Sequence, residues 1–147
     1  MTSISLSEQK PLSYGADASN WLINADNLLA LTALTPQFAE KIQCVYIDPP
    51  YNTGNEFHNY KDDQEHSQWL QFMRVRLHLL HSLLSPTGVL FVSIGEDECH
   101  YLKIAIDEIF GRSNYLGSLI WEKKKKPSFR SKMGVVTEYI LVFAKDK

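Results

Sequence analysis

Cysteine is scarce in this sequence, since only Cys44 and Cys99 occur among 147 residues, and their spacing matches no metal-binding pattern. Two cysteines are too few for a disulfide framework, and the five histidines show no metal pattern either. The chain also lacks an apolar stretch approaching the ~18 residues of a membrane span. Its polar amino terminus has no basic segment followed by an apolar core. We therefore expect a protein of the reduced cytoplasm, without a metal site.

Apolar and aromatic residues are plentiful enough for a packed core. They make up 44% and 12% of the chain, which argues against disorder. The length fits one domain, which would bury ~68–70% of its unfolded surface. Strand-like and helix-like patterns alternate along the chain, so we expect an α/β fold with a doubly wound, mostly parallel sheet and a late antiparallel strand. The predicted helices cover 26–40, 67–84 and 97–110, the predicted strands cover 21–23, 44–47, 89–94, 118–121 and 139–144, and 52–65 is predicted to be a loop.

A carboxylate, two prolines and an aromatic ring follow the apolar run Cys44–Ile47. Open α/β sheets place ligand sites beyond the carboxyl ends of their strands. Each proline fixes its own φ, and the residue before a proline is held extended. The segment Asp48-Pro49-Pro50-Tyr51 is therefore predicted to be a stiff loop that holds an acceptor-rich surface beside a π face. The simpler interpretation is a proline-rich turn with an N-capping aspartate.

Such a surface would suit a flat heterocycle that carries an amino group. The exocyclic amine of adenine is a poor nucleophile, because its lone pair is delocalised into the ring. Two acceptors, the Asp48 carboxylate and the Pro49 carbonyl, would draw that lone pair back onto nitrogen as it attacks an electrophilic methyl group. Tyr51 would stack on a base that has left the duplex. These residue types therefore favour methyl transfer to the amino group of a nucleobase.

The same loop carries a resemblance to a known family. Asp48-Pro49-Pro50-Tyr51 looks like the catalytic motif of amino-group DNA methyltransferases, and residues 20–27 extend the likeness to adenine-specific β-class enzymes. Over roughly residues 20–147 the chain looks most like the Mod subunits of type III restriction–modification systems. Within that family, an aspartate in the first motif position is typical of adenine N6 rather than cytosine N4 methylation. One departure is Ala25, where such relatives usually have glycine.

The resemblance implies a site-specific DNA adenine N6 methyltransferase that uses S-adenosylmethionine. Its partners would be DNA and either a restriction subunit or a second methyltransferase protomer. The implied catalytic residues are Asp48, Pro49, Pro50 and Tyr51. The implied cofactor contacts are Asp26, Asn27, Asp48 and Ser93.

Some acidic and amide side chains near the ends of the predicted helices also have simpler interpretations. Asp26 and Asn27 could cap the helix that follows them, without any contact to a cofactor. Glu98 lies in the first turn of a predicted helix, where the helix dipole stabilises an acid that has no catalytic role. We therefore expect Glu98 to be outside the site.

Positive charge is concentrated at the carboxyl end. From Glu122 onward there are eight Lys or Arg and three acids, whereas the preceding residues hold seven bases and fourteen acids. Such a basic stretch could neutralise DNA phosphates beside the base pocket, although a lysine run is also typical of a solvated loop. The candidate nucleic-acid contacts are Tyr51, Lys123, Lys124, Lys125, Lys126, Arg130 and Lys132.

The order of motifs predicts a fragment. No two of the seven glycines are separated by one residue, so there is no Gly-x-Gly turn through which the backbone could approach a cofactor. In the β-class order, a target-recognition region and a glycine-rich cofactor motif follow the catalytic motif. We therefore expect residues 1–19 to be an extension and 20–147 the catalytic half of a methylase domain. Two alternatives are an RNA base methyltransferase and an inactive truncated module that binds nucleic acid or a partner.

Overall fold

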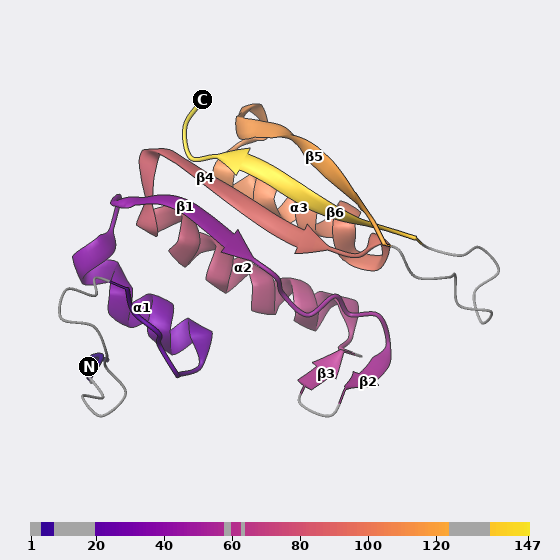
Figure 1. The fold of residues 1–147 in the computed structure, drawn as a ribbon, viewed down its shortest axis with the longest axis horizontal. Helices are drawn as coiled ribbons and strands as arrows, with labels where there is room; N and C mark the ends of the chain where they lie inside the picture. Colours follow the sequence, from indigo (N-terminus) through magenta and orange to yellow (C-terminus); the bar gives the residue numbers. More distant parts are fainter. Residues whose placement is uncertain (1–3, 8–19, 58–59, 63, 124–135) are drawn as a thin grey trace.

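The computed structural model describes residues 4–7, 20–57, 60–62, 64–123 and 136–147. The described chain forms a four-stranded sheet with a layer of helices packed against it, so the expected α/β class is confirmed (Figure 1). The helices are α1 (Asn27–Phe38), α2 (His66–Leu83) and α3 (Glu96–Phe110). The strands of the sheet are β1 (Ile42–Ile47), β4 (Leu84–Ile94), β5 (Tyr115–Glu122) and β6 (Thr137–Ala144).

The sheet is mixed, with strand order β1-β4-β6-β5. The β1–β4 pair is parallel, and β6 pairs antiparallel with both β4 and β5. The late antiparallel strand is therefore confirmed, but the described sheet is not mostly parallel. Strands that follow one another as a hairpin run antiparallel. Because β6 lies between β4 and β5 and runs antiparallel to both, two of the three strand pairs in this sheet are antiparallel.

The core lies between one face of the sheet and the helices. Alternate residues of β4, namely Leu90, Val92 and Ile94, are fully buried. They pack in one cluster with a stripe along α2 whose spacing of three or four residues keeps it on one helix face. Burying each such side chain contributes roughly 1.5–3 kcal/mol. The stripe consists of Trp69, Met73, Leu77 and Leu80.

The other face of the sheet is open in the described chain. The helices α1 and α3 pack on either side of α2, and the sheet lies in front of α2 and α3 in Figure 1. A doubly wound sheet would carry helices on both faces, so this part of the expected topology is not present among the described residues. Large side chains that alternate with the core positions stay exposed, among them Tyr46 at 59% and Trp121 at 62%.

Three local predictions were wrong. Residues 21–23 form no strand and pair with none of the strands in the described chain. The predicted loop 52–65 contains a short antiparallel hairpin of β2 (Asn55–Phe57) and β3 (Tyr60–Asp62). The helix predicted to begin at residue 97 begins at Glu96, and Gly95 is its N-cap residue. Within the described residues we find no helix with the length and apolar character that crossing a membrane requires.

The two cysteines differ in burial, which provides a test of how the sheet and α3 are packed. Cys44 is exposed on β1, whereas Cys99 is buried in α3 and its thiol pKa is raised to about 11 by burial and by the nearby charge of Glu96. Because the thiolate is the reactive form, we expect a thiol reagent at about pH 8 to modify Cys44 and spare Cys99. Labelling followed by peptide mass spectrometry measures this. Cys44→Ser should abolish fast labelling and Cys99→Ser should preserve it; equally fast modification of both thiols would contradict the packing of α3.

Candidate active site

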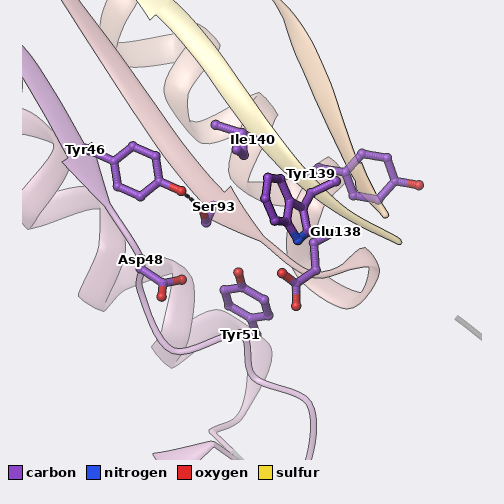
Figure 2. Close-up of a pocket in the computed structure, with 8 residues that line it drawn as sticks. Tyr46, Asp48, Tyr51, Ser93, Glu138, Tyr139 and Ile140 are labelled. Carbon is purple, nitrogen blue, oxygen red and sulfur yellow. Dashed lines mark hydrogen bonds between the residues drawn. The ribbon is translucent and has the colours of Figure 1, made fainter. Parts of the chain in front are cut away.

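The loop Asp48–Tyr51 begins where β1 ends. The parallel strands β1 and β4 pair up to Ile47 and Val92, so Asp48 and Ser93 both follow the last paired residues at the same edge of the sheet. Figure 2 shows the side chains of Asp48, Ser93 and Tyr51 around one space at this edge. The expected placement of these three residues together is therefore seen, and it follows from the shared direction of the two strands.

The prolines of this loop are anchored to α2. The indole Nε1 of Trp69 donates a hydrogen bond to the carbonyl of Pro50 over 2.9 Å. Trp69 is fully buried in the core, so its position is set by the packing of α2. The loop is thereby tied to the hydrophobic core as well as stiffened by its own proline rings.

Tyr51 lies directly against the start of α3. A Cβ placed on Gly95 would come within 3.2 Å of the Tyr51 ring, which is closer than the ring could easily accommodate. Glycine at position 95 therefore permits the ring to pack against the backbone. The next residue, Asn52, has a left-handed backbone with φ of 57° and donates from Nδ2 to Glu98 Oε1 over 2.7 Å. Two consecutive loop residues are thus held on the first turn of α3.

Two cavities meet at the loop. The first, of about 240 Å³, has aromatic side chains at half of its lining positions and is lined by Tyr46, Asp48, Tyr51, Ser93, Trp121, Glu138, Tyr139 and Ile140 (Figure 2). The second, of about 530 Å³, is lined by Asp48, Pro49, Pro50, Tyr51 and Glu138. Asp48, Tyr51 and Glu138 border both spaces, so a molecule in either cavity would meet two carboxylates and the ring of Tyr51.

Negative charge surrounds the hydroxyl of Tyr51. Burial, followed by the charges of Asp48 and Glu138, raises the pKa of this phenol well above its ordinary value. The hydroxyl is therefore neutral throughout the physiological range and can act as a hydrogen-bond donor. Ser93, on the wall of the cavity, bonds to the hydroxyl of Tyr46 at 2.5 Å.

Asp26 and Asn27 lie at the start of α1 and are engaged there. The carboxylate of Asp26 accepts hydrogen bonds from the amides of Leu28 and Leu29 at 3.0 and 3.3 Å, which makes it the N-cap residue. Asn27 accepts from Nε of Arg76, a largely buried guanidinium on α2. Neither residue lines the two cavities. The capping interpretation therefore holds for Asp26 but not for Asn27, and a cofactor contact at either position stays a prediction.

The described part of the basic segment is Lys123, which forms an ion pair with Glu138. This contact places one positive charge next to the carboxylate that borders both cavities. The remaining predicted phosphate contacts lie outside the described residues, so their role stays a prediction: they are Lys124, Lys125, Lys126, Arg130 and Lys132.

Several residues around the site were missed by the sequence analysis. Glu138 is the one charged residue in the apolar strand Thr137–Ala144, a signal that could have singled it out. Tyr46 was interpreted as part of a buried strand, but alternation along β1 turns it to the open face. Glu98 was assigned to the helix dipole alone, yet it is buried and bonded to the loop. Tyr139 reaches the cavity because β6 pairs with β4, and Trp121 reaches it because β5 pairs with β6.

Comparison with known proteins gives consistent matches. The family model described as DNA methylase matches residues 42–147. The chain is 42% identical to the "Probable type III restriction-modification enzyme HindVI Mod subunit" of Haemophilus influenzae, over 95% of this chain and 19% of that protein. It is 34% identical to the EcoP15I Mod subunit of Escherichia coli, over 89% of this chain and 25% of that protein. The chain thus spans about a fifth to a quarter of the length of these relatives.

A solved structure shows the same fold. The M1.HpyAVI–SAM complex superposes with a TM-score of 0.57, covering 85% of this chain and 53% of the other, at 19% sequence identity. At this level of identity the likeness concerns the fold of the backbone.

Proposed function

This chain belongs to the DNA methylase family, and from this premise we propose that it carries the catalytic loop of a DNA adenine N6 methyltransferase. The observation that supports the proposal is the position of Asp48 and Tyr51. Both side chains face one space at the carboxyl ends of two parallel strands, on a loop fixed to the core through Trp69. The relatives named as Mod subunits of type III restriction–modification enzymes support DNA as the substrate.

Each residue of the loop has a distinct role in this proposal. The Asp48 carboxylate and the Pro49 carbonyl accept hydrogen bonds from the two N–H groups of the amino group, and so concentrate its lone pair on the attacking nitrogen. Pro50 fixes the loop through its hydrogen bond from Trp69. Tyr51 presents its ring to the face of a base that has left the duplex. The loop works by preorganisation, because its acceptors need not move when the amino group becomes a nucleophile.

The residues beside Asp48 fit S-adenosylmethionine. The cavity of about 530 Å³ lies within the ~300–1,000 Å³ typical of ligand sites. The carboxylates of Asp48 and Glu138 border it, and they would stabilise the positive charge that this cofactor carries. When bound, the cofactor supplies the electrophilic methyl group. The solved relative in complex with SAM supports the same cofactor here.

The wider assembly is also part of the proposal. Residues 20–147 would form the catalytic half of a methylase domain, and the regions for target recognition and for the rest of the cofactor pocket would come from elsewhere in a longer enzyme. Lys123, Lys124, Lys125, Lys126, Arg130 and Lys132 would contact DNA phosphates. A restriction subunit or a second methyltransferase protomer would be the protein partner, in the cytoplasm.

Complementation tests this proposal. The described chain provides one side of the pocket and an open apolar sheet face, and exposed faces and strand edges promote association. We expect residues 1–147 alone to bind S-adenosylmethionine weakly or not at all, to self-associate, and to leave adenine-containing DNA unmethylated. Adding the remaining part of a related methylase as a second polypeptide should restore cofactor binding and methyl transfer. Calorimetric titration and transfer of a radiolabelled methyl group are the measurements.

Two substrate controls separate the alternatives. A duplex whose adenines already carry N6-methyl groups should take up no label, and an RNA of the same sequence should be a poor substrate. Preference for the RNA would favour an RNA base methyltransferase, and absence of transfer from the complemented enzyme to either nucleic acid would favour an inactive binding module. Tight stoichiometric cofactor binding by the monomeric chain alone would contradict the proposed division of the pocket.

A further inference from the structure

Three separate segments of the chain meet at the side chain of Glu98. Its Oε1 accepts a hydrogen bond from Nδ2 of Asn52, directly after the catalytic loop, over 2.7 Å. Its Oε2 lies 2.8 Å from Nδ1 of His66, the first residue of α2. Glu98 itself belongs to the first turn of α3. One carboxyl group therefore connects the loop with the amino-terminal ends of both helices.

The burial of Glu98 distinguishes it from the acids beside it. Glu98 is 4% exposed, whereas Glu96 and Asp97 in the same helical turn face solvent. The helix dipole favours all three acids equally and gives no reason to bury one of them. Taking a carboxylate out of water is strongly unfavourable unless hydrogen bonds replace the lost hydration. The two contacts of Glu98 supply that replacement, so its position is specific to the loop and α2.

The contacts of Glu98 bear directly on Tyr51. Tyr51 packs against Gly95, and the following residue, Asn52, is bonded to Glu98 three residues further along the same helical turn. The left-handed backbone of Asn52 turns the chain between these two contacts. If the contact to Glu98 were lost, the residue that follows Tyr51 would no longer be bonded to α3, and the ring would keep only its packing against Gly95 on that helix.

We propose that Glu98 is a positioning residue, which holds the loop from Asp48 to Asn52 in its productive geometry through Asn52, with His66 as its second contact. The proposal rests on the proposed function of that loop. Glu98 does not line either cavity and would not touch the base or the cofactor. Its effect on the reaction would be entirely through the placement of Asp48 and Tyr51.

Hydrogen exchange measured by mass spectrometry tests this on the 147-residue chain at low concentration. We expect Glu98→Ala to speed amide exchange at residues 51–54 by ~10–100-fold, the factor for losing a hydrogen bond to a charged group. Exchange in β4 and β6 should stay unchanged. Glu98→Gln should behave almost as the unmodified chain, because its amide oxygen can still accept from Asn52 and its NH₂ group can donate to His66. Asp97→Asn is the matched control and should leave exchange unchanged.

Asn52→Gly removes the same hydrogen bond from the other partner, and so tests the proposal independently if Glu98→Ala does not fold. Glycine tolerates the left-handed backbone but lacks the amide, so this variant should reproduce the faster exchange at 51–54. Adding Glu98→Ala to it should have little further effect on those amides. Unchanged exchange at 51–54 in Asn52→Gly, or equal acceleration across the whole chain in Glu98→Ala, would overturn the proposal.

The complemented methylase gives a second readout. Glu98→Ala should lower kcat while the KM for DNA stays the same, and Glu98→Gln should restore most of the rate. A lowered rate that Glu98→Gln does not restore would overturn the positioning role. Failure of the unmodified complemented enzyme to transfer methyl groups would count against the proposed function, while the exchange result would still decide whether Glu98 holds the loop.

Discussion

Asp48→Ala is expected to reduce methyl transfer by the complemented enzyme ~10²–10³-fold, the loss typical of deleting one preorganised hydrogen-bonding partner of a transition state. Asp48 follows the last residue of β1 and borders both cavities, so its carboxylate is placed where an amino group would react. DNA binding should be largely retained, because the proposed phosphate contacts lie elsewhere in the chain. Single-turnover methylation and a filter-binding assay measure the two properties separately.

Two further variants sharpen this prediction. Asp48→Asn keeps one carbonyl oxygen as an acceptor but removes the negative charge, so it should retain more activity than Asp48→Ala. Asp97→Asn removes an exposed acid from the first turn of α3 and should have little effect. Turnover close to normal in Asp48→Ala would remove Asp48 from the chemistry.

Tyr51→Ala is expected to be severe and Tyr51→Phe mild. Base–aromatic stacking is worth ~1–3 kcal/mol by alanine substitution, and Phe keeps the ring. The hydroxyl is a neutral group between Asp48, Ser93 and Glu138, since its pKa is raised by burial and by the two acids. Losing a typical hydrogen bond at this position costs ~0.5–1.5 kcal/mol. We therefore expect Phe to lower the rate by at most about tenfold, and Ala to lose both contributions.

Base binding and the comparison of the two variants identify whether the ring or the hydroxyl of Tyr51 matters. Loss of stacking should weaken the binding of DNA that contains a flipped or unpaired base, which fluorescence of 2-aminopurine at the target position reports. Equal losses in Tyr51→Phe and Tyr51→Ala would mean that the hydroxyl acts in the reaction and that stacking does not.

Much of the site could be predicted because it is encoded by neighbours in the sequence. The run Cys44–Ile47 has strand character, and the prolines at 49 and 50 stiffen whatever follows it. The stripe along α2 has helical spacing, and the structure places that helix within one residue of its predicted bounds. The periods of strands and helices and the stereochemistry of proline act over a few residues, so no tertiary information is needed.

Pairings between distant segments account for what could not be predicted. The insertion of β6 between β4 and β5 made the sheet mixed, and it brought Glu138 and Tyr139 into the cavity beside Tyr51. No local pattern indicates which strand will lie beside which. Pairing distant strands requires a long loop to close, and the conformational entropy lost on closure is offset only by contacts formed in the folded sheet.

The sequence by itself determined the α/β class, the stiff loop Asp48–Tyr51 at the end of a strand, and the family to which that loop points. The tertiary structure decided which acids belong to the site. Glu98 and Asp97 are adjacent carboxylates, yet only Glu98 is buried, because α3 turns it toward Asn52, 46 residues earlier in the chain. Burial and partnership of a charge depend on surroundings that come together only when the chain folds.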